Sequence, residues 1–281
     1  MSRLPQPLGL VGLGLMGGAL ARAARAVDPA VRIVGVEPSE ATRAQALADG
    51  AVDEAHAAPG PALAGCRLVV LCMPVAAIEA ALGPVSRLLA DGAVLSDVGG
   101  AKEALLSRAR AEVRPGVHFV GAHPMFGGHG GYAGAAAAAG RWRGGRVAVC
   151  SEGEAAAVDL VASFHEALGA TVVRCSAAEH DAAVAMVSHL PYLVASALSV
   201  AAAEAGPLAR ALAGPGLRDT TRLAEFPFDI QGEVSRRNAR LPAAAERLQR
   251  HLAAILSAIA ASPEAARAAL EKARAAREEL F

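Results

Sequence analysis

The chain has 281 residues, of which 54% are hydrophobic and 3% aromatic, so it can bury a sizeable core in one large or two ordinary domains. Its 27 basic and 27 acidic residues give a formal net charge of 0, which argues against nucleic acid or an acidic membrane surface as the main partner. The sequence has no uninterrupted apolar run of about 18 residues, so no membrane span is expected.

The first predicted unit is a strand, a glycine-rich turn and a helix. Leu8 to Val11 is typical of a buried strand, and an alanine-rich helix is predicted from about Met16 to Val27. Gly12, Gly14 and Gly17 form G-x-G-x-x-G between them. The first glycine allows a tight turn, the second leaves room for a pyrophosphate, and the third lets helix and strand pack closely. The N-terminus of the helix offers N–H groups to the phosphates.

A second predicted strand, Val31 to Val36, ends in Glu37, whose carboxylate can accept hydrogen bonds from a ribose 2′-hydroxyl. This acid favours NAD over NADP because it would repel a 2′-phosphate, although Arg43 lies nearby. The alternative is a glycine-rich turn in another α/β fold. The predicted NAD contacts are Gly12, Gly14, Leu15, Met16, Gly17 and Glu37, with Met73, Pro74, Asp97 and Lys102 at the ends of later strands.

Strands and helices alternate from Glu37 to Cys175. The predicted helices are Glu40 to Ala48 with Ser39 as its cap, Val75 to Leu82 with an interruption at Gly83-Pro84, Ala101 to Val113, and Glu154 to Leu168. The predicted strands are Arg67 to Met73, Ala93 to Asp97, Val117 to Ala122, Arg146 to Cys150 and Ala170 to Cys175, with a glycine-rich loop from Gly127 to Gly145. This α/β alternation predicts a Rossmann-type, doubly wound parallel sheet, in a dinucleotide-binding domain over residues 1–175.

From Ser176 only helices are predicted. They are Ala177 to Ala205 with an interruption at Pro191, Pro207 to Ala213, Arg218 to Glu225, Phe228 to Asn238, Ala243 to Ala261 and Pro263 to Glu279. Residues 176–281 are therefore expected to form an all-α domain. A homodimer is favoured over a monomer, because small side chains let such helices pack closely against a second copy.

The four cysteines, Cys66, Cys72, Cys150 and Cys175, form no C-x-x-C pair. Buried free thiols in a reducing cytoplasm are the expected state. The predicted first strand begins too soon after the N-terminus to leave room for a signal peptide. No ligand-spaced cluster of Cys, His, Asp or Glu is present, so no metal site is predicted.

Candidates for chemistry lie where predicted strands end, because ligands of open α/β sheets bind there. His123 follows a strand directly, and its imidazole can accept a proton from a hydroxyl as hydride leaves that carbon. A structural histidine that bonds its own loop is the alternative. Asp97 and Lys102 are expected either to contact the cofactor or loop, or to form an ion pair. His129 is expected at the surface.

The helical half adds further candidates. His189 lies on a mostly apolar helix, as a core histidine or as a substrate contact. Arg218 and Arg222 are four residues apart on a predicted helix and face the same way. Two guanidinium groups suit a carboxylate ligand, and pairing with Asp219 or Glu225 is the alternative.

Six motifs, in this order, resemble those of the prephenate/arogenate (cyclohexadienyl) dehydrogenase family: GLGLMGGALARA, LCMPV, SDVGGAKEAL, GAHPMFGG, MVSHLPYLVASAL and GPGLRDTTRLAE. The resemblance runs from about Leu8 to Asn238. It implies an NAD-dependent enzyme of tyrosine biosynthesis, with a nucleotide-binding domain followed by a helical dimerisation domain. In the reaction that it implies, hydride leaves C4 of the cyclohexadienyl ring for NAD+, the ring carboxylate departs as carbon dioxide, and aromatisation drives the step.

The resemblance also implies roles for single residues. His123 would bond the substrate 4-hydroxyl and take up its proton. Ser188, His189 and Tyr192 would line the substrate site, and Arg222, with Arg218 beside it, would bind a substrate carboxylate.

Two positions depart from the family pattern. Gly100 stands where a serine is usual, which removes one hydrogen bond near the reacting hydroxyl, a loss of about 1 kcal/mol. Tyr192 stands where many members have a histidine. Both bear on the choice between prephenate and arogenate. The competing hypotheses are another β-hydroxyacid-type NAD(P) oxidoreductase and a non-catalytic NAD-binding protein.

Overall fold

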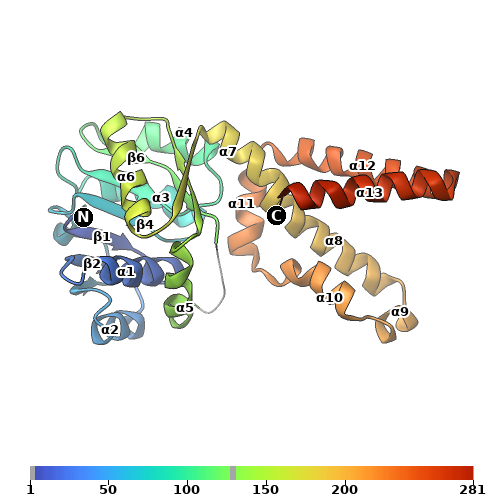
Figure 1. Cartoon of the computed structure of the whole chain (residues 1–281). Helices are drawn as coiled ribbons and strands as arrows, with labels where there is room; N and C mark the ends of the chain where they lie inside the picture. Colours follow the sequence, from blue (N-terminus) through green and yellow to red (C-terminus); the bar gives the residue numbers. More distant parts are fainter. Residues whose placement is uncertain (1–3, 127–130, 281) are drawn as a thin grey trace. The chain divides into compact units, whose positions relative to one another are not determined.

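A computed structural model describes residues 4–126 and 131–280, and its contacts divide the chain into two compact units. The first unit consists of Met1–Val184 and Glu225–Asn238, and the second of Ala185–Ala224 and Ala239–Phe281. The expected combination of an α/β part and a helical part is confirmed (Figure 1). The boundary expected at Ser176 lies just before α7 (Ala177–Val184), which the contacts keep with the first unit.

The first unit is built on a six-stranded parallel sheet with the order β3-β2-β1-β4-β5-β6. Its strands are β1 (Leu8–Val11), β2 (Ile33–Val36), β3 (Glu54–His56), β4 (Leu68–Leu71), β5 (Val94–Asp97) and β6 (His118–Val120). Of these, β3 was not predicted. The strand order reverses direction between β1 and β4, which is where doubly wound sheets bind dinucleotides at the carboxyl ends of their strands.

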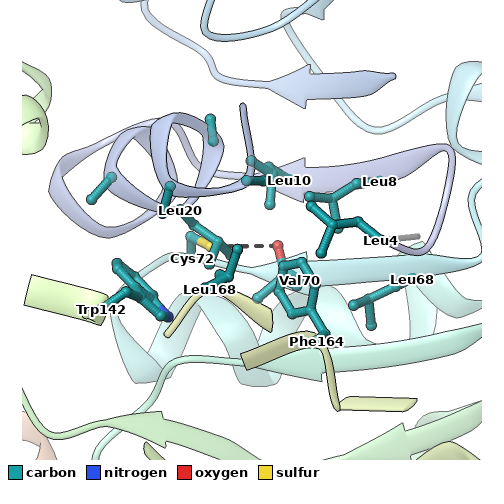
Figure 2. Packing of buried hydrophobic residues seen from close by; sticks show 14 of the residues in the cluster. Leu4, Leu8, Leu10, Leu20, Leu68, Val70, Cys72, Trp142, Phe164 and Leu168 are labelled. Carbon is teal, nitrogen blue, oxygen red and sulfur yellow. Dashed lines mark hydrogen bonds between the residues drawn. The ribbon is translucent and has the colours of Figure 1, made fainter. Parts of the chain in front are cut away.

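Alternate residues of each strand face opposite sides of the sheet, and both sides are covered by helices. Leu10 and Val70 belong to a cluster that includes residues of α1 (Leu15–Val27) and α6 (Ala155–Ala167), together with Trp142 (Figure 2). Leu71 belongs to a second cluster, formed with α3 (Val75–Ser86) and α4 (Glu103–Glu112). The predicted strands are continuously apolar because, as in other parallel sheets, their side chains are buried on both faces.

A second, three-stranded sheet was not predicted. It consists of β7 (Ala122–Pro124), β8 (Arg146–Cys150) and β9 (Thr171–Cys175), with β7 antiparallel to β8 and β8 parallel to β9. The expectation of one strand from Val117 to Ala122 is wrong. The extended segment is interrupted at Gly121 and is divided between β6 and β7. There the Asp97 carboxylate accepts the Ala122 N–H at 3.1 Å, and a Cβ on Gly121 would lie 2.7 Å from Leu106.

Two further expectations in this unit need correction. Helix α3 continues through Gly83-Pro84 to Ser86, because the buried side chains of Ile78, Leu82 and Val85 hold its turns against the sheet on both sides of the proline. The described part of the expected loop from Gly127 to Gly145 contains helical turns, η2 (Gly131–Gly134), α5 (Ala135–Ala139) and η3 (Gly140–Trp142). His129 lies outside the described residues. By contrast, α2 (Glu40–Ala48) has the predicted limits, and the Ser39 hydroxyl accepts the Thr42 N–H at 3.3 Å.

Residues 225–238 return to the first unit through polar contacts. The segment contains a π-helical turn, η6 (Phe228–Gly232), and α11 (Glu233–Arg237). The Arg237 guanidinium donates two hydrogen bonds of 3.0 Å to the Glu79 carboxylate on α3. The Asn238 amide donates to the Asp181 carbonyl at 2.8 Å, which ties the end of α11 to α7.

The second unit is helical in the part that the structure describes. It contains a π-helical turn, η4 (Ala185–His189), then α8 (Leu190–Glu204), α9 (Pro207–Ala211), α10 (Pro215–Thr221), α12 (Leu241–Ala261) and α13 (Pro263–Leu280), with η5 (Arg222–Glu225) after α10. The chain stays helical through Pro191, the second residue of α8, which directly follows the π-helical turn η4. Ser262 caps α13 by accepting the Ala265 N–H at 3.1 Å.

One helical stretch, Ala177–Glu204, is long and apolar enough to cross a membrane by length and composition. Its apolar window has a mean hydropathy of 1.6 and is 28% buried. The stretch contains no uninterrupted apolar run of that length, because polar residues such as Ser188 and His189 divide it. One such helix is weak evidence for a membrane, since a core helix of a soluble protein passes the same test.

Candidate active site

The three glycines of the first turn meet different surroundings. Gly12 has φ +90°, and a Cβ there would lie 2.6 Å from the Cys72 carbonyl oxygen. A Cβ on Gly17 would lie 1.9 Å from the Gly12 carbonyl oxygen, so the fold itself requires both glycines. A Cβ on Gly14, the N-cap of α1, would meet no described atom within 4 Å. Open space at this N-terminus fits a pyrophosphate, and the residues present therefore suit a dinucleotide.

Glu37 lies beside this turn at the end of β2. Its carboxylate accepts the Leu13 N–H and the Ser39 N–H, both at 3.0 Å. Arg43 donates to the carbonyl oxygens of Glu37 and Pro38 at 2.8 and 2.7 Å, so its guanidinium is engaged by the backbone. The acid predicted to contact a ribose is thus held next to the glycine turn.

Four other predicted cofactor contacts lie around the same turn. Leu15 and Met16 form the first turn of α1 and are half-buried. Met73 packs over Gly12, with its Cγ 2.9 Å from the position of a Cβ there, and Pro74 is the exposed N-cap of α3.

Asp97 and Lys102 form a fully buried ion pair, the alternative that the sequence left open. Lys102 Nζ lies 2.5 Å from Asp97 Oδ2, and the carboxylate also accepts the N–H groups of Gly99 and Ala122 at 2.6 and 3.1 Å. A buried ion pair is tolerated when further hydrogen bonds satisfy it, as they do here. The ion pair joins the end of β5 to the N-cap of α4, and the Asp97 carboxylate also binds the start of β7. A direct contact with the cofactor stays a prediction.

His123 lies on β7, half-buried, and its Nδ1 is 2.9 Å from Nε2 of His180 on α7. A Cβ on Gly100 would lie 3.5 Å from both Cε1 and Nε2 of His123, and 3.3 Å from Val234 Cγ1. The Nε2 edge of the imidazole therefore faces Gly100, the position at which the family resemblance leads us to expect a serine. The polar pair His180-Asp181 belongs to one of the sequence stretches near which a ligand is expected, but no role for either residue is predicted from the sequence.

The remaining candidates belong to the second unit. Ser188 and the buried His189 lie in η4, and the half-buried Tyr192 lies in the first turn of α8. Arg218 on α10 and Arg222 at the start of η5 are exposed. Among the residues that the structure describes, neither arginine pairs with a carboxylate, so the alternative of pairing with Asp219 or Glu225 is not observed.

Over residues 4–126 and 131–280, no group of three His, Cys, Asp or Glu side chains is arranged as metal ligands. All four cysteines are free thiols, and three of them are buried.

Family models account for most of the chain. Residues 20–174 match the nucleotide-binding domain of prephenate dehydrogenase, and residues 176–270 match its dimerization domain. The chain belongs to the prephenate dehydrogenase family.

Similar dehydrogenases from other bacteria support this membership. A prephenate dehydrogenase of Bacillus subtilis is 29% identical over 234 residues, which are 80% of this chain and 62% of the relative. A 4-amino-4-deoxyprephenate dehydrogenase of Streptomyces pristinaespiralis is 32% identical over 227 residues, 75% of this chain and 72% of the relative. The chain spans about three fifths of the length of the first curated prephenate dehydrogenases that it matches, 62% and 60%.

A solved structure shares the fold. The prephenate dehydrogenase from A. aeolicus in complex with hydroxyphenyl propionate and NAD+ superposes with a TM-score of 0.87 at 23% identity, covering 100% of this chain and 99% of that one.

Proposed function

We propose that the chain is an NAD-dependent prephenate dehydrogenase, which converts prephenate to 4-hydroxyphenylpyruvate by oxidative decarboxylation in tyrosine biosynthesis. The observation that carries the proposal is the setting of His123: its imidazole is bonded at Nδ1 and presents its Nε2 edge to the loop after β5, in a chain of this family. A base in this position suits removal of a hydroxyl proton.

The glycine turn and Glu37 would hold the cofactor at the carboxyl ends of β1 and β2. NAD+, when bound, accepts the hydride from C4 of the substrate ring. His123 accepts the proton of the 4-hydroxyl at Nε2, and loss of the ring carboxylate as carbon dioxide leaves an aromatic ring. Arg222 and Arg218, both exposed, would bind a substrate carboxylate, and Ser188, His189 and Tyr192 would line the substrate site.

The test is the rise of NADH absorbance with purified protein, NAD+ or NADP+, and one of three substrates: prephenate, arogenate or 4-amino-4-deoxyprephenate. We expect turnover with prephenate and NAD+. Turnover with arogenate alone would move the assignment to that substrate, and turnover with the amino compound alone would follow the Streptomyces relative. NADH binding without turnover of any of them would contradict the proposal and favour a non-catalytic NAD-binding protein.

The role of His123 has its own test. We expect His123→Asn to lower kcat with prephenate by about 10²- to 10⁴-fold, the usual contribution of a general base. NADH binding, followed by fluorescence, should be retained. Unchanged turnover would exclude His123 as the base.

We further propose a cytoplasmic homodimer. The dimerization-domain match over residues 176–270 and the exposed apolar side chains of α8 and α12 support the dimer. The free thiols support a reducing compartment.

A further inference from the structure

His123 is the first of three side chains joined by hydrogen bonds. His123 Nδ1 lies 2.9 Å from His180 Nε2, and His180 Nδ1 lies 2.7 Å from Asp181 Oδ1. The two imidazole rings meet edge-on, with centroids 5.1 Å apart. His180 is 3% exposed and Asp181 is fully buried, so water competes little for these bonds.

Asp181 can only accept at this site. The backbone N–H of Lys102 donates to Oδ1 at 2.8 Å, and that of Glu103 donates to Oδ2 at 2.9 Å. Burial by itself raises the pKa of Asp181, but the hydrogen bonds from His180, Glu103 and Lys102 outweigh it and lower the pKa below its usual value. The group is therefore an ionised carboxylate at neutral pH.

The carboxylate determines which nitrogen of each ring carries hydrogen. Because Asp181 accepts, His180 donates from Nδ1, and a neutral His180 then has its lone pair on Nε2. That lone pair accepts the Nδ1–H of His123, which leaves the lone pair of His123 on Nε2, the atom that faces Gly100.

We propose that His180 and Asp181 are positioning residues for the base: they hold His123 as the Nδ1–H tautomer and stabilise the positive charge that forms when Nε2 accepts a proton. The inference rests on the proposed function.

Two features of the surroundings favour such a relay. The backbone of Asp181 is anchored, since its carbonyl accepts the Asn238 amide at 2.8 Å. The other buried charges nearby, Asp97 and Lys102, neutralise each other through a 2.5 Å ion pair. Asp181, which is linked to His123 through His180, is thus placed to balance an imidazolium at His123.

Two substitutions of His180 separate its two hydrogen bonds. In His180→Asn the amide nitrogen takes the place of Nδ1 and keeps a donor for Asp181, but the acceptor for His123 is lost. In His180→Gln the longer side chain places its amide oxygen where Nε2 lies, so the acceptor for His123 is kept. Both replace the ring by a neutral amide.

In the 281-residue chain, with prephenate and NAD+, we expect His180→Asn to lower kcat about tenfold or more, because a hydrogen bond to a charged group is lost. The acid limb of the kcat profile should move to lower pH, because the imidazolium of His123 loses its link to Asp181. NAD+ KM should not change. His180→Gln should recover part of kcat, because His123 Nδ1 again has an acceptor, but the acid limb should stay at low pH, because the link to Asp181 is still missing. Equal kcat and equal acid limbs in the wild type and His180→Asn would overturn the proposal.

A second measurement depends neither on turnover nor on any substitution of His180 or Asp181. Nitrogen-15 NMR of histidine-labelled wild type reports the tautomer of each ring, and the His123 signals are assigned by their loss in His123→Asn. We expect a protonated Nδ1 and an unprotonated Nε2 at neutral pH. The opposite tautomer would overturn the inference, even if prephenate is a substrate. The expected tautomer without turnover of any cyclohexadienyl acid would count against the proposed function alone.

Discussion

At the scale of single residues, the glycine motif shows what sequence can and cannot predict. Gly12 and Gly17 touch the backbone, as the motif predicts, while Gly14 borders open space. The motif also predicts Glu37 beside the turn, because the turn and Glu37 belong to one strand–helix–strand unit whose two strands are neighbours in the sheet. It cannot predict that His123 bonds His180, 57 residues further along, since that contact depends on the packing of α7.

We expect Gly14→Ala to fold normally but to bind NADH at least tenfold more weakly, because the methyl group would occupy room needed by the pyrophosphate. Thermal unfolding and NADH fluorescence measure the two effects. Gly65→Ala is the matched control, since a Cβ there also meets no described atom within 4 Å. Equal NADH affinities for the two variants would place the cofactor elsewhere.

Gly100→Ser tests the departure beside His123. A Cβ fits at 3.5 Å from His123 and requires a small shift of Val234, so the hydroxyl can reach the substrate 4-hydroxyl. We expect kcat/KM with prephenate to rise by up to about fivefold, equivalent to one hydrogen bond. Gly100→Ala adds the same Cβ without the hydroxyl and should give no gain. A gain of the same size in both variants would show that the hydroxyl is not the cause.

At the scale of elements, sequence predicts best what local hydrogen bonds decide. The Ser39 cap defines the start of α2, and both are confirmed. The interruption at Gly121 between β6 and β7 could not be predicted from the local sequence, because its cause is Asp97 on a neighbouring strand. The predicted interruption of α3 at Pro84 is wrong for a similar reason, because the packing of α3 on the sheet outweighs the missing N–H. Tertiary contacts override local propensity at these points.

Helix α6 carries a buried histidine whose ionisation opposes folding. Burial lowers the pKa of His165 to about 4, and its Nδ1 accepts the Trp142 N–H at 3.2 Å. An unfolded histidine titrates near pH 6.5, so the unfolded chain binds more protons between pH 6.5 and 4. The free energy of unfolding therefore falls as pH is lowered through that range.

We expect this one residue to make the free energy of unfolding about 2 kcal/mol lower at pH 5 than at pH 7. Denaturant titrations at both pH values measure the difference. His165→Asn should remove that part of the pH dependence, whatever it does to absolute stability. The exposed His251→Asn is the control and should leave the dependence as in the wild type. The same pH dependence in all three proteins would show that His165 is not its source.

At the scale of the whole molecule, the order of six motifs predicted the family, and the proposed dimer is supported by the dimerization-domain match and by the exposed surface of α12. Helix α12 exposes Leu252, Leu256 and Ile259, which are 55%, 58% and 53% exposed and lie on one face at helical spacing. Apolar stripes of this kind mark interaction surfaces.

We expect Leu256→Glu to convert a dimer into a monomer, because a carboxylate would be buried in an apolar interface. Light scattering after size exclusion measures the mass. Arg247→Glu introduces the same side chain about half a turn away from that face and should leave the dimer intact. A wild-type mass of one chain would contradict the dimer.

The return of residues 225–238 to the first unit has a consequence for recombination. The chain passes between its units after Val184, after Ala224 and after Asn238. A gene fragment ending at codon 175 would encode the sheet without Asp181, which receives the Lys102 and Glu103 N–H groups, and without the Arg237 partner of Glu79. The units are therefore not exchangeable as contiguous segments. A functional chimaera with a relative must inherit α7 and α11 together with the sheet.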